Sequence, residues 1–525
     1  MTPPTPGGAA PATGRAGGWI LAATILGSSL SFIDGTVVNV ALPALQAGLG
    51  ASVSQVQWVV EAYALFLGAL VLVGGSLGDR YGRRRIFALG IVIFTLASVW
   101  CGLSPTIMQL IIARGIQGIG SALLVPGSLA IITASFDEHE RGKAIGTWSG
   151  FTAITAAIGP LLGGWLIEHA SWHWIFFINV PLAAVVLLIT FWRVPESHDG
   201  DIEGRLDWAG ASLVTISLAG LVYGLVESSN LGFGNPRVIA ALAVGAIALP
   251  AFLYVESHTA TPMMPLSLFR SRAFSGTNLL TFLLYAGLGG ILFFLPFNLI
   301  QVQGYSATQA GAAMLPFIVI MFLLSRWSGG LVAKFGARLP LAVGPAIAAV
   351  GGALFALPGI GGSYWSTWFP AMAVLGIGMA ISVAPLTTTV MGSVPVHNSG
   401  IASGINNAIS RIAGLLSVAV LGIVVLAAFN SALDQRLATS GIPPEARKIV
   451  EAQRAKAAAA KIPEDVPPEL RARLQEIIGT SFVAGFRWAM LISAGLALAG
   501  AAGTLIFIDP KKIPEQSPEP EAATF

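Results

Sequence analysis

The sequence predicts an all-α integral membrane protein, and three observations support that fold class. Of the 525 residues, 55% are hydrophobic and only 10% are charged, whereas soluble domains carry about 25% charged residues. Apolar runs of roughly 20 residues recur along nearly the whole chain, and each is long enough to cross about 30 Å of hydrocarbon. A transmembrane β-barrel would show segments of about ten alternating residues instead. The composition therefore excludes a large soluble enzyme.

Fourteen apolar runs predict fourteen transmembrane helices. Abundant glycine is typical of helices that pack closely in a membrane. The single Cys101 excludes an intrachain disulfide, and the six histidines lack ligand spacing, so no metal and no cofactor are expected. The predicted spans are 18–42, 54–78, 85–103, 106–134, 143–167, 173–193, 207–227, 236–256, 274–300, 308–333, 339–359, 366–391, 399–430 and 482–508.

Basic residues in the loops predict the orientation. If the N-terminus is cytoplasmic, fifteen basic residues lie in short inner loops and tails, whereas the short outer loops hold only Arg237. This bias follows the positive-inside rule, from which long loops such as 431–480 are exempt. Both termini are therefore expected in the cytoplasm. The inner residues are Arg15, Arg80, Arg83, Arg84, Arg85, Arg141, Lys143, Arg193, Arg205, Arg270, Arg272, Lys334, Arg338, Lys511 and Lys512.

An internal repeat divides the chain. The loop "GSLGDRYGRRR" (75–85) and the loop "GGLVAKFGARL" (329–339) place glycine, leucine and basic residues at matching offsets. Two such halves with a substrate site between them are typical of transporters. The predicted units are disordered tails at 1–17 and 511–525, six-helix bundles at 18–195 and 273–510, and two inserted helices at 206–258. The long outer loop, 431–480, reads as one or two short amphipathic helices broken by proline.

Several motifs resemble the fourteen-helix drug:proton antiporter branch of the major facilitator superfamily, the EmrB/QacA-like proteins. The loop from Gly75 to Arg84 is similar to the superfamily signature G-x-L-x-D-R-x-G-R-R, and "LIIARGIQGIGSAL" is similar to its fourth-helix signature. "IDGTVVNVALP", "WHWIFFINVP" and "FLPFNLIQVQGYSATQAGAAMLP" also resemble segments of this branch. The resemblance covers nearly the whole chain and implies a major facilitator fold of two six-helix bundles plus two inserted helices.

Two of these motifs predict conformational roles. The first loop is expected to latch the cytoplasmic side, with Asp79 accepting hydrogen bonds from Arg83 or from a helix N-terminus; the alternative is that its arginines only anchor the topology. Its residues are Gly75, Gly78, Asp79, Arg80, Gly82 and Arg83. The run "GTWSGFTAITAAIGPLLGGWL" resembles the fifth-helix antiporter motif and implies an exporter, although ordinary helix packing also explains close glycines. Its residues are Gly146, Gly150, Gly159, Pro160, Gly163 and Gly164.

Three ionisable residues of the first half are predicted to serve proton coupling. At a rise of about 1.5 Å per residue, Asp34 and Arg114 both lie about 14 Å from the outer end of their spans, and Glu61 lies about 10 Å deep. Because charges in a membrane are costly, these residues are expected to be partners. Asp34 and Glu61 are the predicted protonation sites, modulated by Arg114. The alternatives are a fixed Asp34–Arg114 ion pair and a Glu61 that reaches the headgroups.

The second half shows no buried acid but carries Arg411 in mid-span, beside Asn406 and Asn407. Arg326 and Arg487 lie close enough to an interface to extend into it. The predicted substrate cavity contains Tyr63, Asn298, Gln301, Asn407 and Arg411. Further aromatic candidates are Phe66, Tyr285, Phe293 and Phe294, for which core or lipid contact is an equal explanation.

These observations predict a proton-coupled antiporter that exports hydrophobic, cationic drugs or amphiphiles across the bacterial cytoplasmic membrane by alternating access. The energy source is the proton gradient, since no P-loop sequence is present. Anionic and zwitterionic substrates stay open because of Arg411. The alternative is a lipid or glycolipid translocator on the same fold. No enzyme activity and no nucleic-acid partner are expected, and the protein is expected to act as a monomer.

Overall fold

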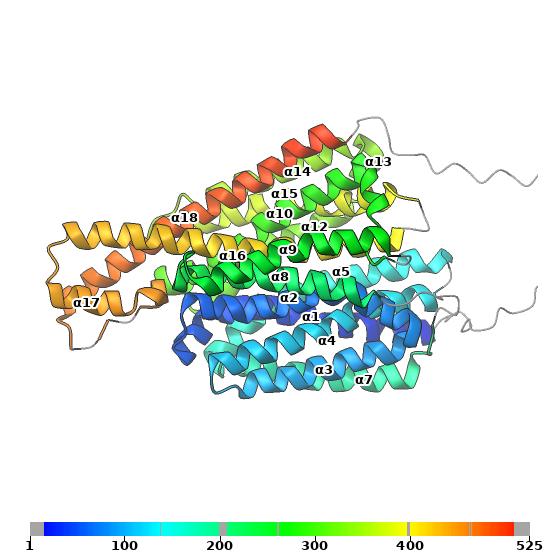
Figure 1. Ribbon diagram of the computed structural model, residues 1–525, viewed down its shortest axis with the longest axis horizontal. Coiled ribbons are helices and arrows are strands. Elements are labelled where there is room, and N and C mark those ends of the chain that lie inside the picture. Colours follow the sequence, from blue (N-terminus) through cyan, green and yellow to red (C-terminus); the bar gives the residue numbers. More distant parts are fainter. Residues whose placement is uncertain are drawn as a thin grey trace, which may run out of the picture.

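The protein is helical throughout the part that the structure describes. The computed structural model describes residues 15–136, 138–198, 207–259, 262–395, 399–460, 462–463 and 465–508, and every regular element in these ranges is a helix (Figure 1). The predicted tails lie outside the described residues, apart from 15–17, which are the start of the first helix.

The described residues of the first half form seven helices, which pack into one bundle. Helix α4 packs against both α2 and α3, and α1 packs against α5 and α7. A capping box of Ser52 and Gln55 starts α2, and Gly82, with φ of 108°, ends it. The helices are α1 (Arg15–Leu49), α2 (Val53–Tyr81), α3 (Arg83–Leu103), α4 (Ile107–Ser135), α5 (Glu138–His169), α6 (Trp174–Phe177) and α7 (Asn179–Arg193).

Two inserted helices, α8 (Trp208–Leu231) and α9 (Pro236–His258), connect the halves. They pack tightly on each other, since a Cβ atom added at Gly245 would lie 2.7 Å from the backbone nitrogen of Leu221. Helix α8 also packs against α2 of the first half and α16 of the second (Figure 1). Helix α8 therefore covers one seam between the halves, and α9 packs on α8.

The second half is a bundle in which α10 contacts α16 and α18, and α14 contacts α15 and α18. Its elements are η1 (Leu266–Arg270), α10 (Arg272–Phe297), the π-helical η2 (Asn298–Val302), α11 (Ala307–Ala313), α12 (Leu315–Ser328), α13 (Leu331–Phe335), α14 (Arg338–Leu354), α15 (Tyr364–Gly392), α16 (Ser399–Thr439), α17 (Pro444–Ala452), η4 (Arg454–Ala459) and α18 (Pro468–Phe507). At the repeat, Gly82 and Gly336 occupy matching offsets, and both have positive φ, 108° and 72°. The two loops thus share one turn that glycine favours.

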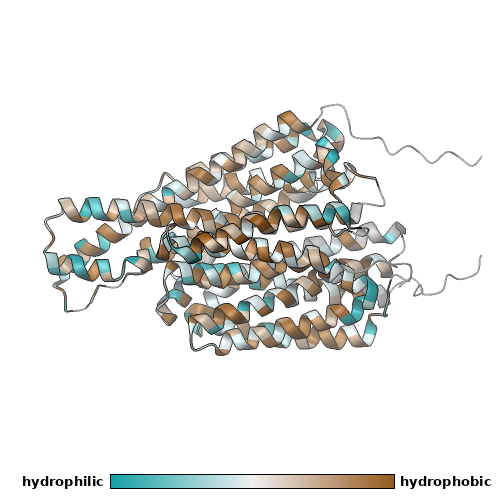
Figure 2. Cartoon of the chain, in the orientation of Figure 1, coloured by the Kyte–Doolittle hydropathy of each residue, from teal (hydrophilic) through white to brown (hydrophobic). Residues whose placement is uncertain are grey.

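Twelve helical segments of the described residues are long and apolar enough to cross a membrane. Two of the predicted spans are interrupted, because the sixth is α6 with α7 and the tenth is α11 with α12. The predicted fifth span coincides with α5, and the eleventh with the shorter apolar α14. Figure 2 shows apolar residues along the helices and more hydrophilic ones at their ends and in the projection at one end. In the most apolar 18-residue stretch of α9, only 22% of the residues are buried inside the protein, as expected for a helix that faces lipid.

Helices α16 and α18 extend beyond the other helices and carry α17 and η4 (Figure 1). We call this end of the molecule the hairpin end. The predicted outer loop is thus largely helical. Its η4 segment packs back on the bundle, since Ala457 is 1% exposed and the Lys456 carbonyl accepts a hydrogen bond from Gln46 Nε2 at 3.2 Å.

Candidate functional site

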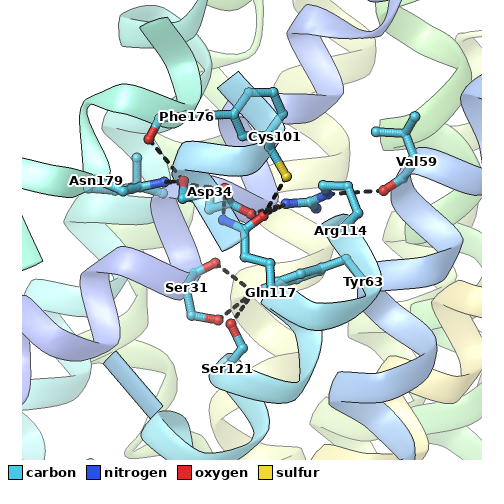
Figure 3. Close-up of polar contacts among 12 residues, drawn as sticks. Ser31, Asp34, Val59, Tyr63, Cys101, Arg114, Gln117, Ser121, Phe176 and Asn179 are labelled. Atoms are coloured by element: carbon cyan, nitrogen blue, oxygen red, sulfur yellow. Dashed lines mark hydrogen bonds and ion pairs between the residues drawn. The ribbon is translucent and has the colours of Figure 1, made fainter. Parts of the chain in front are cut away.

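Asp34 lies at the centre of a hydrogen-bonded cluster in the first half (Figure 3). Arg114 Nη1 donates to Asp34 Oδ2 at 2.5 Å. Gln117 Nε2 and Asn179 Nδ2 donate to Asp34 Oδ1 at 2.9 and 3.4 Å. These residues come from α1, α4 and the first turn of α7, so one carboxylate joins three helices. The depth estimate brought Asp34 and Arg114 together correctly.

The guanidinium of Arg114 has acceptors on several sides. Its Nε donates to the Val59 carbonyl of α2 at 3.0 Å, and its Nη1 also donates to Gln117 Oε1 at 2.7 Å. The same guanidinium lies 4.2 Å from the centre of the Tyr63 ring, a cation–π distance. Arg114 is 1% exposed, and these partners offset the cost of burying its charge.

Tyr63, a predicted cavity residue, is instead a buried member of this cluster. Its hydroxyl lies 2.6 Å from Ser31 Oγ and 2.8 Å from Ser121 Oγ (Figure 3). Asn179 lies in the segment "WHWIFFINVP", but nothing in that sequence predicts a role for it. Gln117 was likewise part of a recognised motif without a role. Helix crossing brings both onto Asp34, and the linear spacing carries no signal of that contact.

Glu61 is buried but isolated. Its side chain is 1% exposed, and neither carboxyl oxygen has a hydrogen-bond partner among the described residues. The expectation that it would pair with Asp34 or Arg114 is therefore not met. One turn earlier on α2, Gln57 Nε2 donates to the Val418 carbonyl of α16 at 3.1 Å. Since residues four apart share a helix face, Glu61 lies on the side of α2 that meets the second half.

Arg411 lies on the matching side of α16. A Cβ atom added at Gly68 of α2 would lie 3.7 Å from the Arg411 Cβ atom, so the two helices meet there. On its other side, Gly289 of α10 meets Gly414 of α16, one turn after Arg411. In the part of the chain that the structure describes, no hydrogen bond or ion pair to Arg411 occurs. Glu61 and Arg411 are thus ionisable side chains on helices of opposite halves, each without a hydrogen bond or ion pair among the described residues.

The other predicted cavity residues of the second half lie apart from one another. Asn407 is exposed and donates to the Ser403 carbonyl of its own helix at 3.2 Å. Asn298 is buried and accepts from Gln303 at 3.0 Å, whereas Gln301 Nε2 donates to Gln46 Oε1 of the first half at 2.9 Å. The Gln301 contact joins the halves at the hairpin end.

Three further candidates from the sequence have other surroundings. Arg487 reaches carbonyl oxygens at the end of the α14 region, while Phe293 and Phe294 are core residues; the side chain of Arg326 lies outside the described residues.

The predicted latch contains the expected ion pair and one partner that the sequence did not reveal. Arg83 Nε donates to Asp79 Oδ1 at 2.7 Å. Glu196, which follows α7, accepts the backbone N–H of Arg84 at 3.0 Å and lies 3.6 Å from the Arg85 guanidinium. Arg80 stacks near Tyr81, at 5.7 Å from its ring. The loop is thus tied to the end of α7 as well as to itself.

The glycines of the latch loop and those of α5 differ in which atoms lie close to them. At the latch, a Cβ atom at Gly74 would lie 2.0 Å from the Ala122 carbonyl oxygen and one at Gly82 would lie 2.7 Å from Glu196 Oε1. At Gly75 and Gly78 the nearest atoms are 3.6 and 3.9 Å away. On α5, Gly159 and Gly163 contact α1 of the same half. The environment of Gly146 is open, and the side-chain region of Gly150 lies outside the described residues.

Helix α5 also contacts the second half. A Cβ atom added at Gly164 would lie 2.3 Å from the carbonyl oxygen of Ala307 on α11, and one added at Gly311 would lie 2.2 Å from the Pro160 carbonyl oxygen. Helix α5 continues through Pro160. Ser306 Oγ donates to Glu168 Oε2 at 3.0 Å across the same seam. The hairpin end is therefore closed by near backbone contact.

Comparison with known proteins identifies the family. The family model described as Major Facilitator Superfamily matches residues 24–418. The chain belongs to the major facilitator superfamily. The resemblance predicted from the motifs is confirmed at this level.

Similar members of the superfamily include proteins named for drug resistance. The Tetracenomycin C resistance and export protein of Streptomyces glaucescens is 31% identical over 510 residues, which cover 95% of this chain and 94% of that protein. The Multidrug resistance protein Stp of Mycobacterium tuberculosis (strain CDC 1551 / Oshkosh) is 33% identical over 431 residues, covering 82% and 80%. The Puromycin resistance protein pur8 of Streptomyces alboniger is 35% identical over 411 residues, covering 77% and 81%.

Solved structures of the superfamily share the fold. A bacterial homologue of the human lysosomal transporter Spinster, inward-facing and unoccupied, matches with a TM-score of 0.64 at 19% identity, covering 94% of this chain and 99% of that one. A D-xylose-proton symporter matches with a TM-score of 0.59 at 16% identity, covering 94% and 98%. Superfamily membership and the many apolar spans make this chain a multi-pass transporter of the bacterial cytoplasmic membrane.

Proposed function

We propose that this transporter exports hydrophobic drugs, cationic ones among them, in exchange for protons by alternating access. The relatives named for resistance to tetracenomycin C, puromycin and multiple drugs support export of such compounds. The observation that carries proton exchange is Glu61, a buried acid without a hydrogen-bond partner in the described part of the chain.

The isolation of Glu61 suits a residue that exchanges ligands. A charged carboxylate buried without a partner costs several kcal/mol, and either a bound proton or a cationic drug removes that cost. Competition between the two for one carboxylate is sufficient to couple their movements in opposite directions. Because α2 meets α16 of the other half at this face, occupancy of Glu61 also bears on how the halves pack.

Asp34 has a different role in this proposal. Arg114, Gln117 and Asn179 donate hydrogen bonds to its side chain while α1, α4 and α7 stay packed. We propose that Asp34 takes up a proton only when this cluster opens, with Arg114 as the group that competes with the proton.

The topology proposed for this cycle is fourteen crossings with both termini in the cytoplasm and a monomeric protein. The distribution of basic residues supports this orientation, which makes the hairpin end the outer face. Cys101 is the sole cysteine and is buried. We therefore expect a membrane-impermeant thiol reagent to label Lys448→Cys on α17 in intact cells. If the cysteine reacted only after the cells were lysed, the proposed orientation would be contradicted.

The experiment on function uses the purified protein in lipid vesicles with ethidium as the transported cation. An imposed pH gradient is expected to drive ethidium transport by the wild type, and Glu61→Gln is expected to reduce it to the level of vesicles without protein. The matched control is Glu227→Gln on α8, whose carboxylate accepts from Trp58 Nε1 at 2.9 Å. Equal gradient-driven transport by wild type and Glu61→Gln would refute the assignment of Glu61.

A further inference from the structure

Helix α16 carries an arginine deep within the membrane region. Arg411 lies twelve residues after the start of α16 at Ser399, which at 1.5 Å per residue corresponds to about 18 Å. That depth is beyond the reach of an arginine extended to the nearer interface. Charged residues at such depth are costly and face the protein interior or an aqueous path.

The neighbours of Arg411 place it between the two halves. Its Cβ atom lies next to Gly68 of α2, and Tyr285 of α10 lies at its level, because Gly289, one turn after Tyr285, meets Gly414, one turn after Arg411. The next residue, Ile412, packs against the cluster formed by α2, α8 and α16, and its Cγ1 atom also lies near Gly68. Successive side chains of a helix are turned by about 100°, so Arg411 lies at the seam where α2 and α10 approach α16.

Arg411 lacks the counter-charge that Arg114 has. Arg114 is saturated by Asp34, Gln117 and the Val59 carbonyl, whereas Arg411 has no hydrogen bond or ion pair within the described ranges. The buried acids of the first half do not serve it, because Asp34 is bound to Arg114 and no ion pair joins Glu61 to Arg411. Arg411 is also partly exposed, whereas Arg114 is 1% exposed.

We propose that Arg411 binds an acidic group of the transported compound, a carboxylate or a phenolate, at the seam of α2, α10 and α16, with Tyr285 at its level on α10. The proposal rests on the proposed export function and names one chemical class of its substrates. Guanidinium binds planar carboxylates through two parallel hydrogen bonds, and neighbouring rings favour flat aromatic frames. With Glu61 unpaired on the opposite half, the site also accepts a compound that carries both an acid and an amine.

The test compares two dyes that share one aromatic frame. Fluorescein carries an acid, and rhodamine 6G is a cationic ester without one. Equilibrium binding to the full chain in detergent is measured by fluorescence polarisation. Arg411→Gln is expected to weaken fluorescein binding by about tenfold or more, the usual effect of losing a hydrogen bond to a charged group, while rhodamine 6G binding stays within about twofold. Arg411→Lys keeps the charge and is expected to lose less.

Arg487→Gln is the matched control, because this exposed arginine contacts only backbone carbonyls at the hairpin end among the described residues. Retained rhodamine 6G binding shows that each variant is folded. The proposal is overturned if the wild type does not bind fluorescein, if Arg411→Gln leaves its affinity unchanged, or if both dyes are lost in parallel. Binding requires no gradient, so failure of gradient-driven ethidium transport would refute the proposed function without deciding this result.

Discussion

Asp34 and Glu61 are two acids of the first half with equal burial and opposite surroundings. Each is 1% exposed. Asp34 receives hydrogen bonds from Arg114, Gln117 and Asn179, whereas Glu61 receives none from any described residue. Both side chains end in a carboxyl group and are equally buried, so neither the functional group nor its burial decides what an acid does in this protein. The number of donors that the neighbouring helices supply decides it.

The comparison separates structural from exchanging charge. The Asp34 carboxylate compensates the Arg114 guanidinium, and removing either leaves a buried charge alone. Glu61 pairs with no charged group in the described part of the structure, so its removal leaves no buried charge without a partner. The same substitution, acid to amide, therefore has opposite expected consequences at the two positions.

The largest effect is expected for Asp34→Asn. This change leaves Arg114 without its counter-charge and should lower the free energy of unfolding by about 3–5 kcal/mol, the usual cost of breaking a buried ion pair. Thermal unfolding of the purified protein in detergent measures the loss. Glu61→Gln is the matched comparison and is expected to unfold at or above the wild-type temperature. Equal destabilisation by both changes would show that Glu61 has a structural partner.

A double substitution tests whether Asp34 and Arg114 act as one unit. The combined loss in Asp34→Asn with Arg114→Gln should be smaller than the sum of the single losses by about 2 kcal/mol, because the second change removes the orphaned charge. Unfolding of the four proteins under one condition gives this coupling. Additive losses would mean that the 2.5 Å contact contributes no net stability.

Much of the architecture was predictable because a membrane-spanning helix is recognised by the length of its apolar run. The sequence also located Asp34 and Arg114 at one depth, since that estimate needs only the helical rise. The depth of a residue along its helix does not determine, however, in which direction around the helix axis its side chain points. The amide of Asn179 reaches Asp34 and the carboxyl of Glu61 reaches no described donor, because the helices are turned in a way that packing determines. Likewise, Glu196 meets the latch from 112 residues away in sequence.

The glycines at the two ends of the α5 motif, Gly146 and Gly164, differ in how closely other atoms approach them. A methyl group at Gly164 would lie 2.3 Å from the Ala307 carbonyl oxygen, whereas one at Gly146 would meet nothing within 4 Å. Gly164→Ala should therefore weaken closure of the hairpin end by about 1–3 kcal/mol, as for overpacking in a core. Ethidium transport in vesicles is expected to fall severalfold in Gly164→Ala and to stay at the wild-type rate in Gly146→Ala. Equal rates for both variants would contradict a role of this contact in transport.

The smallest effect is expected at Glu196, an acid whose ion pairs are partly exposed. Its carboxylate lies 3.7 Å from Arg84 Nε and 3.6 Å from Arg85 Nε, and the Arg85 side chain is 75% exposed. Water screens such pairs, so Glu196→Gln should cost less than about 1 kcal/mol, and the difference from wild type should shrink further at high salt. The Asp34→Asn loss should persist in the same salt, because that pair is 1% exposed or less. Thermal unfolding at low and high ionic strength checks both expectations, and a salt-independent loss at Glu196 would mean that its hydrogen bond to the Arg84 backbone, rather than charge, holds the latch to α7.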